Sequence, residues 1–150
     1  MRKTCALTGH RKLPPHFSVN ALHDKLEEMI QGGCDRFLCG MAQGFDLCAL
    51  ACLVSLRQKY KITLVACVPY RGQERGFSQE GRREYVRLLE QCDEVNILQE
   101  KYEAGCLLAR NRYMADRADV LLAYCERESG GTAYTVRYAQ KHGVPVEFLE

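Results

Sequence analysis

The sequence Gly40-Met41-Ala42-Gln43-Gly44-Phe45-Asp46 stands between two apolar segments. A short run, residues 36–39, precedes it, and a longer one, residues 47–56, follows it. This order predicts a strand, a glycine-containing turn and the first turn of a helix. Glycine lets the backbone turn tightly and lets a ligand approach, and the first N–H groups of a helix have no partner within it. The stretch therefore predicts an anion site, of the kind that most often holds a phosphate.

The composition is that of an ordinary globular protein. The 150 residues are 47% hydrophobic and 27% charged, which predicts one domain over residues 1–150 with its own core. A formal net charge of +2 gives no argument for a nucleic-acid or membrane partner. Nine cysteines, without a Cys-x-x-Cys pair, favour buried thiols over a disulfide framework. With no signal-peptide core and no membrane-length apolar run, we expect a cytoplasmic protein.

Apolar runs and helical periodicities alternate along the whole chain. We expect strands at residues 3–7, 36–39, 61–68, 94–98, 120–124 and 144–148, and helices at residues 22–30, 47–56, 80–91, 105–118 and 132–143. A parallel crossover requires a helix and is right-handed. The alternation therefore predicts an α/β fold, a doubly wound, mainly parallel sheet between two helical layers. Pro145 near the start of the last strand indicates an edge position.

Loops that leave the ends of these strands carry the candidate ligand-binding residues. In parallel sheets, ligands bind beyond the carboxyl ends of the strands, where the strand order reverses. With the common order 3-2-1-4-5-6, the loops after strands 1, 2 and 5 would reach one crevice. These loops are Thr8-Gly9-His10-Arg11, residues 40–46 and Ser129-Gly130-Gly131-Thr132, and residues 70–79 form a fourth candidate.

Three of these segments, residues 8–11, 40–46 and 70–79, each have a purely structural alternative. Thr8-Gly9-His10-Arg11 offers a hydroxyl and two cations, but a simple turn with a solvated Arg11 explains it equally well. Asp46 could accept hydrogen bonds from a ribose, or it could complement the dipole of its helix. Tyr70, Gln73 and Phe77 could stack on a base or hydrogen-bond to it, unless their loop is simply a mobile surface segment.

Two later segments add donors for an anion. Gly130-Gly131-Thr132 offers backbone N–H groups and a hydroxyl at a helix start. Arg110 beside Asn111 lies among apolar neighbours, and its guanidinium matches a phosphate or a carboxylate. The alternative is an ordinary salt bridge from Arg110 to Asp116 or Asp119.

The sequence gives no sign of a metal or of a known catalytic arrangement. The four histidines lack metal-ligand spacing, and Cys48 and Cys52, one helical turn apart, fit packing better than ligation. We therefore expect no metal site. Neither a Ser-His-Asp set nor a pair of carboxylates can be recognised, so catalytic residues are unknown at this stage.

These motifs, in their order along the chain, resemble the YpsA-like family of the SLOG superfamily, which also contains the DprA and LOG proteins. The matching segments are Thr8-Gly9-His10-Arg11, Gly40-x-Ala42-x-Gly44-x-Asp46, Pro69-Tyr70-x-x-Gln73, Arg110-Asn111-x-x-Met114-x-x-x-Ala118-Asp119 and Gly131-Thr132. The resemblance implies a Rossmann-like domain, frequently dimeric, that binds a nucleotide-derived ligand such as a nucleoside phosphate, NAD or ADP-ribose. The pocket it implies is lined by Thr8, Gly9, His10, Arg11, Gly40, Gly44, Asp46, Arg110, Asn111, Gly131 and Thr132.

The chain departs from related patterns at two places. LOG phosphoribohydrolases carry Gly-Gly-x-Gly-Thr-x-x-Glu, whose glutamate assists cleavage of the N-glycosidic bond, and the matching position here is Thr135. An enzyme would therefore need Asp46 or Glu128 as its carboxylate. Many YpsA-like members place a tryptophan after the Pro-x-x-x-Gln turn. Phe77 is the candidate substitute, and it would keep the stacking surface but not the indole N–H.

Three functions follow from this reasoning. We favour a sensor or regulatory module that binds a nucleotide-derived ligand, which is the only cofactor-like molecule we expect. The second is a LOG-like hydrolase of nucleotide N-glycosidic bonds. The third is single-stranded DNA binding, as in DprA, but the basic residues are scattered, so we do not expect nucleic acid as a partner. A homodimer is expected, and a membrane partner is not.

Overall fold

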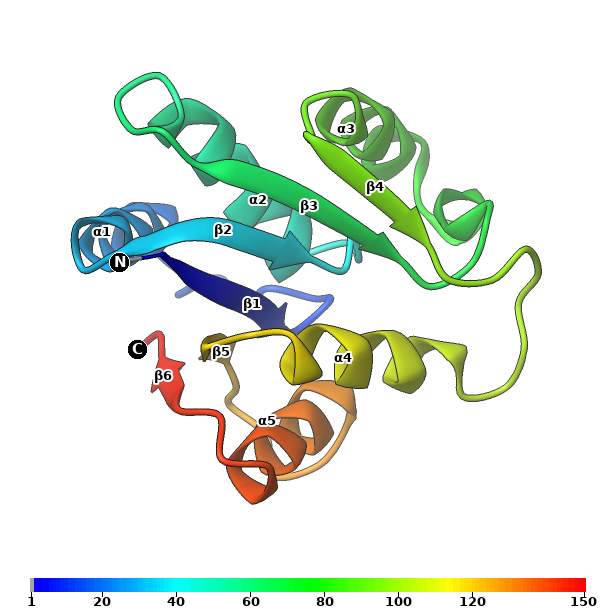
Figure 1. Ribbon diagram of the computed structural model, residues 1–150. Coiled ribbons are helices and arrows are strands. Elements are labelled where there is room, and N and C mark those ends of the chain that lie inside the picture. Colours follow the sequence, from blue (N-terminus) through cyan, green and yellow to red (C-terminus); the bar gives the residue numbers. More distant parts are fainter. Residues whose placement is uncertain (1) are drawn as a thin grey trace.

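A computed structural model describes residues 2–150 and shows one twisted sheet between two layers of helices (Figure 1). The elements, in chain order, are β1 (Lys3–Gly9), α1 (Val19–Gln31), β2 (Cys34–Cys39), α2 (Phe45–Leu56), β3 (Thr63–Val68), the short 3₁₀ helix η1 (Gln73–Gly76), α3 (Gln79–Leu89), β4 (Glu94–Ile97), α4 (Cys106–Asp116), β5 (Val120–Tyr124), α5 (Gly131–Lys141) and β6 (Val146–Phe148). Every strand and helix expected from the sequence is present, with ends shifted by up to a few residues.

All six strands run parallel, in the order β4-β3-β2-β1-β5-β6. The predicted parallel α/β fold and the edge position of β6 are therefore confirmed. The assumed order 3-2-1-4-5-6 is wrong, because β4 lies outside β3 instead of beside β1. The chain steps outward from β1 to β4 without reversing, and only then returns past β1 to form β5. The reversal of strand order consequently lies between β1 and β5.

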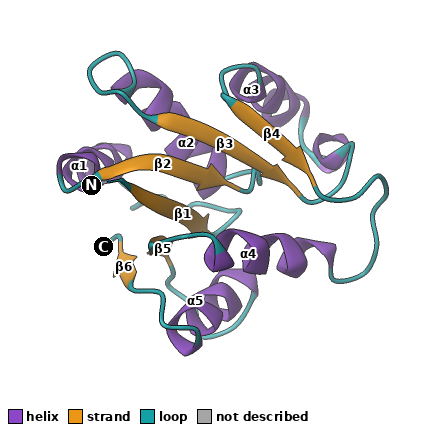
Figure 2. Ribbon diagram, viewed as in Figure 1, coloured by secondary structure: helices purple, strands orange, loops and turns teal. Residues whose placement is uncertain are grey.

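The two helical layers follow from this order. A right-handed crossover places its helix on one face when the chain steps outward, and on the opposite face when the chain steps back. Accordingly α1, α2 and α3 cover one face of the sheet, and α4 and α5 cover the other (Figure 2). Successive residues of β3 serve the two cores in alternation, Leu64 and Ala66 on the first face and Val65 and Cys67 on the second.

The apolar character of residues 47–56 has a packing cause. Helix α2 contacts the sheet on one side and α1 and α3 on its flanks, so nearly all of its surface is covered. Its Leu50 and Leu53 are fully buried in the larger core. Each such side chain contributes about 1.5–3 kcal/mol of burial free energy, which anchors the turn that precedes the helix.

The cysteines behave as small apolar side chains. Cys5, Cys39, Cys52 and Cys67 are buried in the two cores, Cys48 is partly exposed, and all nine thiols are free. Among residues 2–150, no helix combines the length and the apolar character needed to cross a bilayer.

Candidate functional site

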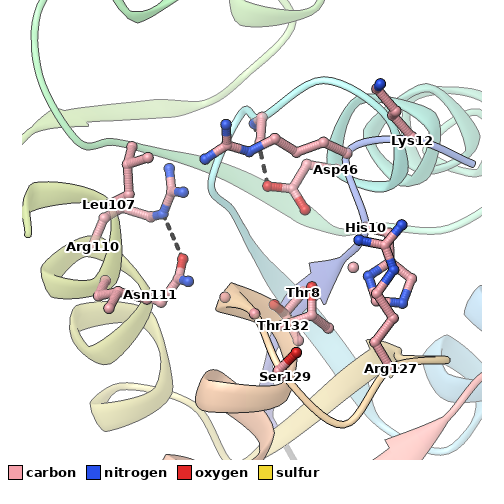
Figure 3. A pocket seen from close by; sticks show the side chains of 16 residues that line it. Thr8, His10, Lys12, Asp46, Leu107, Arg110, Asn111, Arg127, Ser129 and Thr132 are labelled. Carbon is pink, nitrogen blue, oxygen red and sulfur yellow. Dashed lines mark hydrogen bonds between the residues drawn. The ribbon is translucent and has the colours of Figure 1, made fainter.

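A cavity of about 620 Å³ opens where the strand order reverses, beyond the carboxyl ends of β1 and β5. Figure 3 shows α4 side chains on one side of it, His10 and Arg127 on the other, and Thr8 and Thr132 between them. Neighbouring loops diverge at such a reversal and leave a crevice for ligands. The lining comprises Thr8, Gly9, His10, Arg11, Lys12, Ala42, Asp46, Leu107, Leu108, Arg110, Asn111, Arg127, Ser129, Gly130, Gly131 and Thr132.

A second cavity of about 470 Å³ adjoins the first and contains the rest of the predicted loops. Its lining comprises Arg11, Lys12, Ala42, Gln43, Gly44, Tyr70, Gln73, Gly76, Phe77, Leu107 and Arg110. Of the fifteen residues predicted for the site, only Gly40 lines neither cavity. Sequence reasoning missed Lys12, Leu107, Leu108 and Arg127. The two basic residues lie within four positions of predicted loops, whereas the two leucines carry no chemical signal.

Gly40 lies beneath the site, and its carbonyl joins three elements. The carbonyl oxygen accepts hydrogen bonds from Arg110 Nη1 and from Gln73 Nε2, the latter at 3.2 Å. A Cβ atom at this position would lie 2.8 Å from Arg110 Cζ, so only glycine leaves room for the guanidinium. The end of β2, the η1 segment and α4 are thereby fixed to one another below the cavity floor.

Gln73 lines the second cavity and has, in addition, a structural role. Its Oε1 accepts a hydrogen bond from the Tyr85 hydroxyl at 3.2 Å, and its Nε2 donates to the Gly40 carbonyl. Both ends of the buried amide thus have protein partners. The Pro-x-x-x-Gln turn is therefore a support for the second cavity, and Tyr70 and Phe77 are the aromatic side chains that line it.

We expect Tyr85→Phe to lower the free energy of unfolding by about 1–2 kcal/mol, because it leaves the buried Gln73 oxygen without a donor. Urea denaturation followed by circular dichroism measures this change. Tyr102→Phe is the matched control, since Tyr102 is 61% exposed. Equal stabilities of the two variants would show that the Tyr85–Gln73 hydrogen bond does not hold the turn.

Arg110 does not form the salt bridge that the structural alternative proposed. The Asp116 carboxylate accepts from the Tyr138 hydroxyl, and the Asp119 carboxylate accepts from the Thr4 N–H. Arg110 Nε instead donates to Asn111 Oδ1 at 2.8 Å, as drawn in Figure 3. The side chain is only 4% exposed, and this burial lowers its pKa while nearby Asp46 opposes the change. Arg110 is therefore a cation held at the cavity wall by neutral partners.

Asp46 supplies the only carboxylate among the described residues that line the two cavities. Its Oδ2 accepts a hydrogen bond from the Ala42 N–H at 3.2 Å. Burial raises its pKa to about 6, and Arg110, the Ala42 N–H and Arg11 limit the rise. Near neutral pH the group is a mostly ionised acceptor, which suits a hydroxyl of a ligand better than an anion.

The N-terminus of α2, inside residues 40–46, is already covered by protein. The Phe45 N–H donates to the His10 carbonyl at 3.0 Å, and Asp46 occupies the first turn. Gly44 adopts φ +84°, and the carbonyls of His10 and Arg11 pack directly against its Cα. This stretch therefore positions the first loop and Asp46, and the Phe45 N–H is not free to donate to a ligand.

Helix α5 presents an open N-terminus to the same cavity. Its N-cap, Gly130, provides no side-chain hydrogen bond to the first turn, and Gly130, Gly131 and Thr132 line the cavity. The hydroxyls of Thr8 and Thr132 make no hydrogen bond within residues 2–150, although these residues are only 5% and 8% exposed. Hydroxyls that face the cavity from two largely buried residues, together with helical amides at the same wall, form a ready site for phosphate oxygens.

His10 joins the first loop to the loop after β5. Its Nε2 accepts a hydrogen bond from the Glu126 N–H at 2.8 Å. Because a backbone N–H can only donate, Nε2 carries no proton and the imidazole is neutral. Burial and the nearby Arg127 both lower the pKa of His10, in agreement with this state. His10 thus shapes the cavity by fixing one loop to another.

The residue at the position expected for a LOG-type glutamate makes a hydrogen bond within its own helix. Thr135 is buried, and its Oγ1 donates to the Gly131 carbonyl within α5 at 2.8 Å. Glu128, the other carboxylate considered, is exposed and lines neither cavity. Within the described part of the chain, no three His, Cys, Asp or Glu side chains gather as metal ligands.

Comparison with known proteins supports the resemblance found in the motifs. A protein-family model named YpsA, described as the YspA SLOG family, matches residues 15–148. A UPF0398 protein of Bacillus cereus (strain G9842) is 29% identical over 127 residues, which cover 82% of this chain and 69% of that protein.

Solved structures show the same fold. DNA processing protein A from Helicobacter pylori superposes with a TM-score of 0.69 at 18% identity, over 97% of this chain and 64% of that one. DprA from Streptococcus pneumoniae gives 0.70 at 15% identity, over 97% and 50%. The chain thus spans about half to two thirds of the length of these structures.

One of these structures overturns an expectation about partners. The Helicobacter pylori protein is described by its single-stranded DNA binding mode. The judgement that nucleic acid could be set aside is therefore wrong, because scattered basic residues in the sequence do not show where the fold gathers them. Both the ordered motifs and the family model agree on the assignment, and the chain belongs to the YpsA family of SLOG proteins.

Proposed function

We propose that this protein binds a nucleotide-derived ligand in the cavity between β1 and β5 and acts as a sensor or regulatory module of the cytoplasm. The observation that carries the proposal is the wall formed by the α5 N-terminus and the hydroxyls of Thr8 and Thr132, which line the cavity without a hydrogen-bond partner among residues 2–150. Such a wall binds phosphate oxygens, because amide and hydroxyl donors replace the water that a phosphate loses. The free thiols fit a reducing compartment.

The rest of the cavity suits the sugar of such a ligand. Asp46 Oδ1 makes no hydrogen bond within residues 2–150 and can accept from a ribose hydroxyl. Asn111 uses its Oδ1 for Arg110, which leaves its NH₂ group to donate. Binding without turnover is favoured because the cavity contains one carboxylate and the LOG-type position is Thr135.

Thermal-shift and calorimetric titrations with AMP, ADP-ribose and NAD test the proposal. We expect at least one of them to raise the melting temperature, and Thr132→Val to weaken its binding about 5- to 10-fold through loss of one hydrogen bond. Thr63→Val is the matched control, because Thr63 lies at the amino end of β3 and lines neither cavity. No shift with any of the three ligands would contradict the proposal. Release of free base from AMP would instead establish the hydrolase.

Single-stranded DNA is the second candidate ligand. The fold is similar to that of a DNA processing protein, and Arg11, Lys12 and Arg127 line the cavity. Binding to DNA through these cations would release counterions, so its affinity would fall steeply with salt. Fluorescence anisotropy with an oligothymidylate at several salt concentrations tests this candidate, and no binding at low salt excludes it.

A further inference from the structure

A separate cavity of about 190 Å³ lies on the face of the sheet that α4 and α5 cover. These helices lie beside β1 and β5, and strands β3 and β4 extend beyond them (Figure 2). The cavity occupies the corner between the C-terminal end of α4 and the neighbouring strands, and none of its described lining residues belongs to either cavity at the carboxyl ends. We call it the sheet-face cavity. Its lining comprises Thr4, Arg36, Leu38, Val65, Cys67, Asn96, Tyr113 and Arg117.

The floor of the sheet-face cavity is apolar and uncharged. Residues paired across neighbouring strands point to the same side of a sheet, and Leu38 pairs with Val65 while Cys67 pairs with Asn96. Leu38, Val65 and Cys67 are at most 3% exposed and belong to the smaller core. Burial raises the pKa of the Cys67 thiol to about 12, so the thiol is neutral at physiological pH. Such a floor suits the hydrocarbon part of a ligand.

The rim of this cavity carries donors that lack an acceptor. Arg117 Cζ lies 3.6 Å from the centroid of the Tyr113 ring, and Arg117 Nη1 donates to the Tyr113 carbonyl at 3.0 Å. These contacts hold the guanidinium in place, yet Arg117 forms no ion pair within residues 2–150. The Asn96 amide and the Thr4 hydroxyl, over the same range, make no hydrogen bond. A fixed guanidinium beside an amide matches a carboxylate.

The charge and the size of the cavity both limit its occupant. Arg36 Nη1 and Nη2 donate to the two Glu94 carboxylate oxygens at 2.7 and 2.9 Å, so the charge of Arg36 is already balanced. None of the described residues that line the cavity is acidic, and Arg117 is therefore the one cation of that lining without a counterion. An apolar cavity of about 150 Å³ holds benzene. A volume of about 190 Å³ thus suits one ring with one negative charge.

We infer that the sheet-face cavity is a second ligand site, which binds a small carboxylic acid with a ring-sized apolar body, of which benzoate is the simplest. The ring lies on the floor formed by Leu38, Val65 and Cys67, and the carboxylate accepts hydrogen bonds from Arg117 and Asn96. This site is separate from the cavity between β1 and β5, so the inference does not depend on the proposed function.

NMR titration of the full chain, labelled at its leucine and valine methyl groups, tests the inference with benzoate, acetate and benzamide. We expect benzoate to shift the methyl signals of Leu38 and Val65. It should bind at least about 10-fold more tightly than acetate, which lacks the ring, or benzamide, which lacks the charge. Arg117→Gln should weaken benzoate about 10-fold. Asn96→Asp, which places a second carboxylate beside that of the ligand, should abolish the shifts.

Matched controls are Arg83→Gln and Asn20→Asp, which replace exposed residues outside all three cavities and should leave benzoate binding unchanged. Circular dichroism checks that each variant keeps the fold. Shifts confined to Leu107 and Leu108, which line the 620 Å³ cavity, would overturn the inference, because benzoate would then bind there. Equal affinities for benzoate and benzamide, or methyl signals of Leu38 and Val65 that do not respond to benzoate, would overturn it as well. All these outcomes leave the proposed function to its own titrations with nucleotides.

Discussion

Gly44→Ala is expected to lower the free energy of unfolding by about 3 kcal/mol or more, the largest stability effect that we predict for a single glycine. Two costs combine at this position. Gly44 has φ +84°, which side-chain-bearing residues rarely adopt. In addition, an added Cβ would overlap the Arg11 carbonyl and lie 2.6 Å from the His10 carbonyl oxygen. Both obstacles are backbone atoms, so neither can move aside without displacing the first loop.

Two other glycines separate these costs. Gly143 has φ +78° but no atom within 4 Å of an added Cβ, so Gly143→Ala should cost about 1 kcal/mol through backbone strain alone. Gly76 has neither positive φ nor a close neighbour, and Gly76→Ala should be nearly neutral. Urea denaturation of the three variants checks this ranking. If Gly44→Ala costs no more than Gly143→Ala, the first loop is not packed against the turn as described.

Asp46→Asn is expected to stabilise the protein at neutral pH and to change its stability little at pH 4. Burial raises the pKa of Asp46 from its ordinary value near 3.8 to about 6. Between these two values the native state binds the proton more tightly than the unfolded state, so wild-type stability falls as pH rises from about 4 to about 6. A shift of two pKa units corresponds to about 3 kcal/mol. The asparagine variant does not titrate and avoids this loss.

Unfolding free energies of wild type and Asp46→Asn at pH 4, 5, 6 and 7 provide the test. The difference should grow over this range to about 3 kcal/mol in favour of the variant. Asp24→Asn is the control, because Asp24 is exposed on α1 and lines neither cavity. A difference that stays constant with pH would show that the ionised Asp46 is fully compensated by its neighbours. The stabilised variant should also lose ligand affinity if Asp46 holds a ribose hydroxyl.

The reversal of strand order illustrates a limit of reading a sequence locally. The alternation of apolar runs with helical periodicity shows that β4 and α4 exist, but it carries no signal for which strand β4 pairs with. The sheet places β4 at an edge, where its Val95 and Ile97 are exposed. Pairing depends on contacts between residues far apart in the chain, which one sequence does not encode in its local pattern. In the assumed order β4 would separate β1 from β5, whereas in the structure these two strands are adjacent and their loops meet at one cavity.

Gln73 and Arg110 show the same limit at the level of single residues. Both belong to motifs that the sequence marks as functional, and both hold the Gly40 carbonyl in the structure. A polar residue inside a motif can serve a ligand or the fold, and only the positions of its neighbours decide between them. Lys12 shows the converse. It lines both cavities, but nothing in its local sequence distinguishes it from an ordinary surface lysine.

The sequence by itself determined the alternation of strands and helices, the parallel sheet and the family, because apolar periodicity and glycine turns are local properties of the chain. It also placed the loops that line the two cavities at the ends of β1, β2, β3 and β5. Only the tertiary structure decided that the first N–H of α2, that of Phe45, is bonded to the His10 carbonyl, and that Arg11, Lys12 and Arg110 share one wall. The physical reason is that hydrogen-bond saturation and charge clustering depend on partners brought together by folding.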